Sequence, residues 1–279
     1  MSNLGRKIIS QTMIWGALAC AMIAIVPLIS ILAYVVSQGI GSINWEFFTH
    51  LPKPVGEDGG GMANAIVGTL ILVALSCVWA VPVGVFGGVY LAEYGDGKAA
   101  SIIRFTADVL TGVPSIVIGL FAYVLLVLPM KSFSALSGAL ALGFMLIPTV
   151  LRTTEEMVRL VPMTLREAAL ALGISRFRAT LNIVIATAKS GILTGILLSV
   201  ARIAGETAPL LFTAFGNRVW SHDAFEPIAA LPLQIFVYAI SPFDDWHRQA
   251  WAGALVLIVL VMSLTIVSRL WTKRTYQVH

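Results

Sequence analysis

An arginine and a glutamate lie four residues apart inside a long apolar stretch, as Arg202 and Glu206 in the sequence ARIAGETAPLLF. Residues four apart share one face of a helix, so the two side chains can form an ion pair. A charged side chain deep in a membrane costs at least about 2.5 kcal/mol and therefore faces a protein or water interior. An arginine fork matches a tetrahedral oxyanion, and a neighbouring glutamate keeps the anion from binding too tightly to leave. The pair therefore indicates an anion pathway, with a buried ion pair that holds helices together as the alternative.

A second charged group lies at the end of the preceding apolar stretch, in the sequence RTTEE. Arg152 and Glu155 are three residues apart and share a helical face. We interpret them as an inner binding point for the same anion. The alternative is a basic anchor at the membrane surface with solvated acids. Asp108, in an earlier apolar stretch, is expected simply to lie near the inner membrane interface.

The segment between these two stretches reads REAALALG. Its adjacent alanines are small enough for a helix to lie close against a partner, and its last glycine can end that helix in the left-handed conformation. Thr164, three residues before the glutamate, predicts a capping box at the start. The segment therefore indicates a docking helix, with an ordinary interfacial helix as the alternative. The residues expected to carry the docking are Arg166, Glu167, Ala168, Ala169 and Gly173.

The whole chain is far more apolar than a soluble protein. Of its 279 residues, 58% are hydrophobic and 11% are charged, and the mean hydropathy is +0.90, whereas soluble domains carry about 25% charged residues. A membrane-spanning helix needs about 20 mostly apolar residues. Six stretches qualify: Met13–Val36, Met62–Ala92, Ile102–Leu128, Phe133–Leu151, Ala188–Phe215 and Trp251–Trp271. The sequence therefore predicts an all-α, polytopic bundle of six transmembrane helices, a single domain over 1–279 with a core at about 62–271 and a cytoplasmic loop at about 159–187.

Six spans place both termini on one side of the membrane, and the basic residues gather on that side. Four fall on the other side, namely Lys53, Lys131, Arg218 and Arg248. Twelve fall on the side of the termini: Arg6, Lys7, Lys98, Arg104, Arg159, Arg166, Arg176, Arg178, Lys189, Arg269, Lys273 and Arg274. Since cytoplasmic loops carry the excess of basic residues, both termini are expected in the cytoplasm. The first span is expected to be a retained anchor, because its apolar part is too long for a signal peptide.

Several other kinds of site are not predicted. The basic residues form no single patch, which argues against nucleic-acid binding. Cys20 and Cys77 lie in apolar stretches and the histidines are scattered, so we expect no metal site. Gly97 and Lys98 lack the flanking residues of a nucleotide-binding loop, so the chain is not expected to hydrolyse ATP. Two longer outer segments, 37–61 and 216–249, are interpreted as aromatic anchors, as a docking surface for a partner outside the cell membrane, or as both.

Several segments resemble known permeases. REAALALG resembles the EAA loop of ABC transporter permeases, the short helix that sits on the ATPase subunit, although Ala186 stands where the wider consensus has proline. Over most of Ile43 to Leu270 the chain resembles PstA-type permease subunits of bacterial phosphate ABC importers. The stretches that carry this resemblance are LAEY at 91–94, PSIVIGLF at 114–121, RTTE at 152–155, LREAA at 165–169, the run from Arg202 to Ala214, and SPF at 241–243.

The resemblance implies an ABC importer permease (MetI-like) fold in the bacterial inner membrane and a role as half of a phosphate pathway. It implies a PstC-type permease, a dimeric PstB-type ATPase and a PstS-type phosphate-binding protein as partners, besides phosphate and membrane lipid. ATP and magnesium belong to the ATPase, and this chain is expected to hold no cofactor and no catalytic residue. By position, the resemblance places Arg152, Glu155 and Arg202 on the phosphate pathway, and Glu206 joins them from its helical spacing.

Two alternatives stay open at this point. A permease for another oxyanion, such as molybdate, sulfate or phosphonate, needs arginines of the same kind, because an arginine does not specify its anion. A stand-alone, ion-coupled carrier is the other alternative. Inverted repeats would favour such a carrier, but none is visible, and the EAA-like segment would then lack a role.

Overall fold

The computed structural model describes residues 3–54, 57, 59–221 and 223–276. Within these ranges the regular structure is helical, and the one β-type contact is an isolated bridge between Phe215 and Ile228. The description excludes the side chains of 3–6, 8, 268, 269 and 271–276. The predicted inner positions of Arg6, Arg269, Lys273 and Arg274 therefore lie outside the described side chains.

Six helices make up most of the chain: α1 (Asn3–Gly39), α3 (Ala63–Tyr94), α4 (Lys98–Gly112), α7 (Ala135–Arg159), α10 (Ile185–Ile203) and α13 (Asp244–Tyr276). Shorter elements connect them: η1 (Ile40–Ser42), α2 (Trp45–Thr49), α5 (Ser115–Ala122), the π-helix η2 (Tyr123–Val127), α6 (Leu128–Met130), α8 (Met163–Ala171), α9 (Arg176–Ala179), the π-helix η3 (Thr180–Val184), α11 (Ala208–Thr213) and α12 (Leu231–Ala239). Five helical segments are long and apolar enough to span a membrane, or six if one bent pair counts as a span. The predicted polytopic helix bundle is therefore confirmed.

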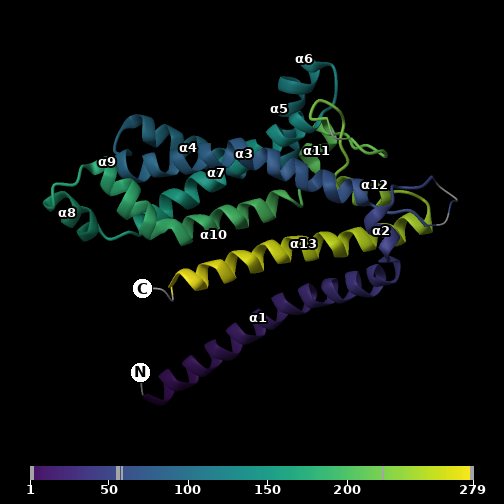
Figure 1. Ribbon diagram of the computed structural model, residues 1–279. Helices are drawn as coiled ribbons and strands as arrows, with labels where there is room; N and C mark the ends of the chain where they lie inside the picture. Colours follow the sequence, from purple (N-terminus) through teal and green to yellow (C-terminus); the bar gives the residue numbers. More distant parts are fainter. Residues whose placement is uncertain (1–2, 55–56, 58, 222, 277–279) are drawn as a thin grey trace.

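Helices α3 and α7 form the centre of the bundle (Figure 1). Glycines of α3 lie against α7 so closely that a Cβ at Gly84 would lie 2.8 Å from the side chain of Val150, and one at Gly88 would lie 2.5 Å from the carbonyl oxygen of Leu151. Glycine is what lets the two backbones approach to this distance. Helix α10 packs beside them, and side chains of these three helices contribute to the apolar core that includes Leu146.

The third predicted span, Ile102–Leu128, is not one straight helix. Helix α4 ends at Gly112, α5 begins at Ser115, and the two segments are bent by 106°. Pro114 has no backbone N–H and pushes the preceding residue out of the helical region, and Val113 is accordingly extended at φ −70° and ψ 132°. Helix α4 therefore lies along α7, while α5 and α6 turn away from it (Figure 1).

The fifth predicted span, Ala188–Phe215, is also interrupted. The helical segment begins earlier, at Arg176, and ends at Ile203, and α11 starts again at Ala208. Pro209 stands in the first turn of α11, where its missing N–H costs nothing. The fourth span, predicted to end at Leu151, continues to Arg159. The charged residues at its end therefore lie on the helix itself.

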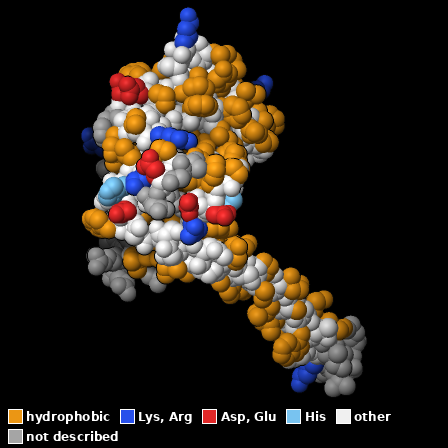
Figure 2. Space-filling view, turned by 90° about the vertical axis from the view of Figure 1, so that its right-hand side faces the viewer, with side chains coloured by type: hydrophobic (Ala, Val, Ile, Leu, Met, Phe, Trp, Pro, Cys, Tyr) orange, Lys and Arg blue, Asp and Glu red, His pale blue; other side chains and the backbone are white. Residues whose placement is uncertain are grey.

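The two ends of the molecule are formed by different elements. Helix α1 begins and α13 ends at the end where α8 lies, which we call the inner end, whereas α2 and α12 lie at the opposite, outer end (Figure 1). Acidic and basic side chains gather on the outer end, and α1 extends from it as an arm with a largely hydrophobic surface (Figure 2). Only 6% of the apolar window of α1 is buried. Its contact with the bundle lies near Gly39 and Tyr34, which meet Trp251 of α13.

Replacing Gly88 with alanine should destabilise the bundle. The new Cβ would meet the backbone of α7, which cannot yield as a flexible side chain would, and overpacking of this kind costs about 1–3 kcal/mol. We expect a lower melting temperature for the detergent-purified protein. Gly16→Ala is the matched control, because Gly16 of α1 has open space around it. Equal melting temperatures for the two variants would show that the α3–α7 contact is looser than described.

Candidate functional site

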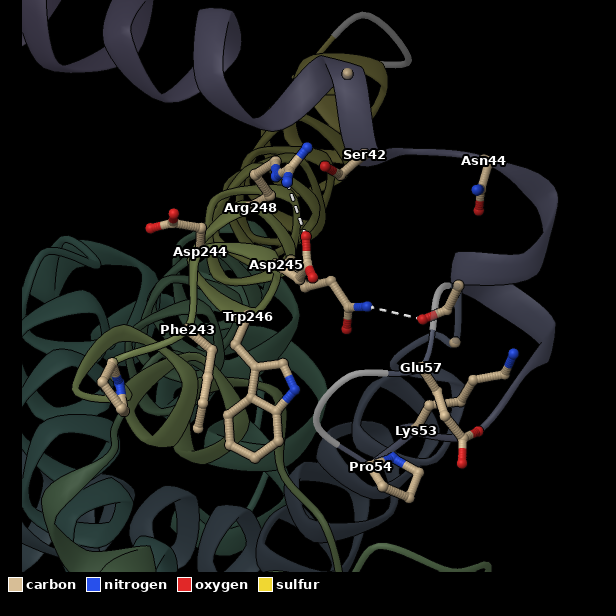
Figure 3. Close-up of a pocket in the computed structure, with 15 residues that line it drawn as sticks. Ser42, Asn44, Lys53, Pro54, Glu57, Phe243, Asp244, Asp245, Trp246 and Arg248 are labelled. Atoms are coloured by element: carbon tan, nitrogen blue, oxygen red, sulfur yellow. Dashed lines mark hydrogen bonds and ion pairs between the residues drawn. The ribbon is translucent and has the colours of Figure 1, made fainter.

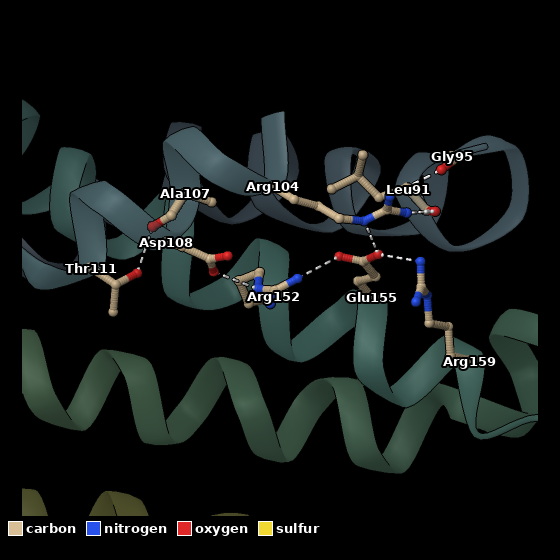
Figure 4. Close-up of polar contacts among 9 residues, drawn as sticks. All are labelled: Leu91, Gly95, Arg104, Ala107, Asp108, Thr111, Arg152, Glu155 and Arg159. Atoms are coloured by element: carbon tan, nitrogen blue, oxygen red, sulfur yellow. Dashed lines mark hydrogen bonds and ion pairs between the residues drawn. The ribbon is translucent and has the colours of Figure 1, made fainter. Parts of the chain in front are cut away.

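Glu155 is the centre of a polar network inside the bundle (Figure 4). Its side chain is 2% exposed, and three guanidinium groups surround it. The Nε of Arg104 lies 2.7 Å from Oε1, an Nη of Arg159 lies 2.8 Å from the same oxygen, and an Nη of Arg152 lies 3.2 Å from Oε2. A buried carboxylate is tolerated only when paired and hydrogen-bonded. The three arginines meet that requirement.

Arg104 extends this network to a third helix. Its two Nη atoms donate to the carbonyl oxygens of Gly95, at 3.0 Å, and Leu91, at 2.8 Å, at the inner end of α3. The guanidinium of Arg104 thus holds α3, α4 and α7 together around Glu155. From the sequence, Arg104 was predicted only to lie on the inner side, and its pairing with Glu155 was not predicted.

Asp108 belongs to the same network, so its assignment to the membrane interface alone was incomplete. Its Oδ1 lies 2.9 Å from Nε of Arg152. The spacing held a usable signal, because Arg104 and Asp108 are four apart on α4, while Arg152, Glu155 and Arg159 are three or four apart on α7. Each charged face was predictable, but the pairing of one face with the other was not.

The network carries an excess positive charge. Three arginines and two carboxylates sum to 3 − 2 = +1. The charge is accessible at one edge, because the side chains of Arg152 and Asp108 are 34% and 55% exposed. An arriving oxyanion can therefore replace Asp108 as a partner of the Arg152 guanidinium without uncovering Glu155.

Arg202 and Glu206 form a second, looser pair. The Nε of Arg202 lies 3.9 Å from Oε1 of Glu206, beyond hydrogen-bonding distance, and the Arg202 side chain is 54% exposed. The two residues do not share a continuous helix as predicted, because α10 ends at Ile203 and the chain turns through Gly205. A half-exposed, loosely paired guanidinium is available to an anion.

Arg202 and Glu155 lie at different levels of the bundle. Gly195 of α10 lies against Thr153 of α7, and the two helices run in opposite directions (Figure 1). Arg202, seven residues after Gly195, therefore lies level with the region of Leu146. Leu146 and Glu155 are nine residues apart, or about 13 Å along α7. The charged residues predicted from the sequence thus form two separate points rather than one cluster.

Helix α8 occupies the predicted docking segment. It begins after Pro162, and no side chain caps it, so the predicted capping box with Thr164 is wrong. At its other end Gly173 has φ +76°, and bonds from Gly173 N to Leu170 O and from Ile174 N to Ala169 O close a Schellman motif. The left-handed glycine was therefore correctly predicted.

The residues of this segment face in two directions. Glu167 and Ala168 are exposed, as is Gly173 after the helix. Ala169 is 2% exposed, and Arg166 points toward the inner end of α3. The outward face of α8 is the part available to another subunit, whereas Arg166 and Ala169 contact their own chain.

The two outer segments meet around an open, polar cavity of about 620 Å³ (Figure 3). One wall comes from the loop before α3 and includes Lys53 and Glu57, and the other comes from the start of α13. Within the second wall Arg248 pairs with Asp245 at 2.7 Å, and Gln249 joins the two walls by donating to the carbonyl oxygen of Gly59 at 3.1 Å. Docking of an external partner here stays a prediction.

Comparison with known proteins places this architecture among transporters. Residues 84–276 match the family described as the inner membrane component of binding-protein-dependent transport systems. The phosphate transport system permease protein PstA of Yersinia pestis is 46% identical over 254 residues, which cover 91% of this chain and 86% of the relative. The PstA of Xylella fastidiosa strain 9a5c is 47% identical over 266 residues, covering 95% and 92%.

Solved transporters share the fold. The inward-facing MetNI methionine ABC transporter superposes with a TM-score of 0.60 at 14% identity, covering 76% of this chain and 96% of the other. An amino acid ABC transporter gives a TM-score of 0.56 at 19% identity, covering 75% and 92%. The predicted MetI-like fold is therefore confirmed.

Replacing Glu155 with glutamine should strongly destabilise the protein. The change leaves three guanidinium groups around a neutral amide, and breaking a buried ion pair costs about 3–5 kcal/mol. We expect a large drop in the melting temperature in detergent. The adjacent Glu156 is exposed, so Glu156→Gln should change stability by no more than about 0.5 kcal/mol. Similar melting curves for the two variants would contradict the role given to Glu155.

Proposed function

Because the chain belongs to the PstA phosphate transport permeases, within the family of binding-protein-dependent transport system inner membrane components, we propose that it forms half of the translocation pathway of an ATP-driven phosphate importer. It is a multi-pass membrane protein. Its relatives are permease subunits, so the chain supplies a path rather than a catalytic centre. The observation that carries the proposal is the pair of partly exposed arginines, Arg202 and Arg152, at two levels of one bundle.

Each arginine on this route has a carboxylate beside it that limits how tightly phosphate is held. Phosphate first meets Arg202, whose distance to Glu206 leaves the guanidinium fork open. It then reaches Arg152, where it competes with Asp108 beside the excess positive charge of the arginines around Glu155. Arginine suits this task because its planar fork pairs with two oxygens of a tetrahedral anion. Since transport requires release as well as binding, both acids serve the route.

The proposed partners follow from the two ends of the molecule. A dimeric PstB-type ATPase binds the outward face of α8 and supplies the sites for ATP and magnesium, so this chain holds no cofactor. Helix α1 begins and α13 ends at the same end as α8, which supports a cytoplasmic position for both termini. A PstC-type permease completes the path, and a PstS-type protein delivers phosphate at the outer end. Residues 1–279 act as one permease domain, with the coupling loop at about 159–187.

Motion of α8 supplies the coupling in this proposal. Closure of the ATPase dimer displaces α8, and the attached spans expose the arginines alternately to the two sides of the membrane. A permease for molybdate, sulfate or phosphonate would work in the same way, and the names of the relatives favour phosphate. A stand-alone carrier would leave the outward face of α8 without a role.

Arg202→Gln should reduce phosphate uptake by about tenfold or more, because the amide keeps the shape but loses the charge of the fork. Labelled phosphate uptake is measured in cells with the full complex, with molybdate and sulfate in parallel. Lys189→Gln, at an exposed position of the same helix, is the control and should transport normally. Normal phosphate uptake by Arg202→Gln would show that Arg202 and Glu206 serve only to hold the structure together and do not lie on the pathway. If the wild-type complex took up molybdate or sulfate in place of phosphate, the assignment of phosphate as the substrate would be wrong.

Ala168→Arg should prevent the ATPase from copurifying with this chain. The exposed alanine lets α8 lie close against a partner, and a long charged side chain removes that fit without disturbing the permease interior. The matched control is Ala99→Arg, because Ala99 is exposed at the inner start of α4. If Ala168→Arg retained the ATPase as well as Ala99→Arg does, α8 would not be the docking helix.

A further inference from the structure

One arginine joins the docking helix to two membrane-spanning helices. The Nε and Nη2 of Arg166 donate to Oε1 of Glu93, at 2.9 and 2.7 Å, and Glu93 is the penultimate residue of α3. Nη2 also donates to the carbonyl oxygen of Val158 at 2.9 Å, and Nη1 donates to that of Val161, at the inner end of α7. A single side chain of α8 is thus bonded to α3 and α7 together.

The far side of the docking loop is attached to the same residue. Arg176, the first residue of α9, donates to the main-chain carbonyl of Glu93, and its guanidinium lies 4.6 Å from the centre of the Tyr94 ring. Glu93 therefore bonds α8 through its side chain and α9 through its main chain. The Glu93 and Arg166 side chains are 5% and 15% exposed, so water screens their attraction only weakly.

Apolar packing contributes little to the attachment of α8. Ala169 is the one buried residue among the nine residues of α8, all of which are described. Met163 and Leu170 are 64% and 51% exposed. A cavity of about 260 Å³ lies beside the ion pair, between α8 and α9. The helix therefore has room to shift, and the polar contacts of Arg166 with Glu93 and with the two carbonyls of α7 are its main tie to the bundle.

We propose that Glu93 and Arg166 act as a clamp that makes α8 move as one body with the inner ends of α3 and α7. The two are positioning residues, which touch neither phosphate nor the ATPase. Helix α7 carries Arg152, so the clamp passes a displacement of α8 directly to the anion site. Without the clamp, α8 follows the ATPase while the spans stay in place. This inference rests on the proposed function, because it requires that α8 receive the motion.

The first test measures phosphate uptake and ATP hydrolysis in the same proteoliposomes, with the complete complex. For Glu93→Gln we expect uptake per ATP hydrolysed to fall by about tenfold, which is the loss of a coupling between sites, while hydrolysis stays within about twofold. Glu156→Gln, the same chemical change at an exposed inner position, should leave the ratio unchanged. Arg166→Lys keeps the charge, but lysine cannot reach the carboxylate and both carbonyls at once. Its uptake per ATP hydrolysed should therefore lie between the values for Glu93→Gln and Glu156→Gln.

Two results would overturn the clamp. An unchanged ratio in Glu93→Gln is one of them. The other is loss of the ATPase from the purified Glu93→Gln complex, because the pair would then only shape the docking surface. A wild-type complex that takes up molybdate or sulfate instead of phosphate would overturn the proposed substrate, and the clamp would then be judged by the same ratio with that anion.

The second test measures the distance between α8 and α3 directly. Spin labels are placed at Leu172, the residue that follows α8, and at Phe86 of α3, which are 80% and 73% exposed. Cys20 and Cys77 are first replaced by serine. Rigid-body motion predicts that the distance changes by less than about 2 Å between nucleotide-free and nucleotide-bound complexes. The Glu93→Gln complex should give a broader distribution. A nucleotide-dependent shift of more than about 5 Å with the clamp intact would refute rigid coupling.

Discussion

A buried carboxylate imposes the arrangement of the inner half of this bundle. The Glu155 side chain is 2% exposed, and a buried carboxylate is stable only if cationic donors surround it. Those donors come from α4 and α7, and one of them, Arg104, also bonds the end of α3. The glycine contacts of α3 on α7 bring the two backbones close enough for Arg104 to reach both Glu155 and the end of α3. Close packing and charge neutralisation thus depend on each other.

The arginines of the bundle differ in exposure and in how fully they are paired. The Arg166 side chain is 15% exposed, and four of its five N–H donors are bonded to one carboxylate and two carbonyls, so it has little to offer an anion. The Arg152 side chain is 34% exposed and pairs with both Asp108 and Glu155. The Arg202 side chain is 54% exposed and lies 3.9 Å from its one carboxylate partner. Arginine therefore ties helices together at the inner end, and the proposed function uses two other arginines, farther along the bundle, as anion ligands.

The spans were predictable from the length of the apolar stretches, because a bilayer demands that length. The breaks within the spans were harder to predict, because the apolar residues continue through the bend at Pro114 and past Ile203. Helix α7 outlasts its apolar stretch by two turns because charged side chains three and four apart support each other on its face. Pairings across the fold were not predictable: Arg104 and Glu155 are 51 residues apart, and Glu93 and Arg166 are 73 apart. Those contacts depend on how the helices pack, which spacing along one helix does not reveal.

The π-helical turn η3 sets the rotational phase of the fifth span. A π-turn bonds residues five apart where an α-turn bonds residues four apart, so it absorbs one additional residue. Each residue of an α-helix turns the chain by about 100°. If residues 180–184 were wound as a regular α-turn, α10 would be rotated by that angle relative to α9. Arg202 lies 202 − 184 = 18 residues beyond η3, or about 27 Å along the helix. The direction in which this cation points is therefore decided at the inner end of the span, next to α8.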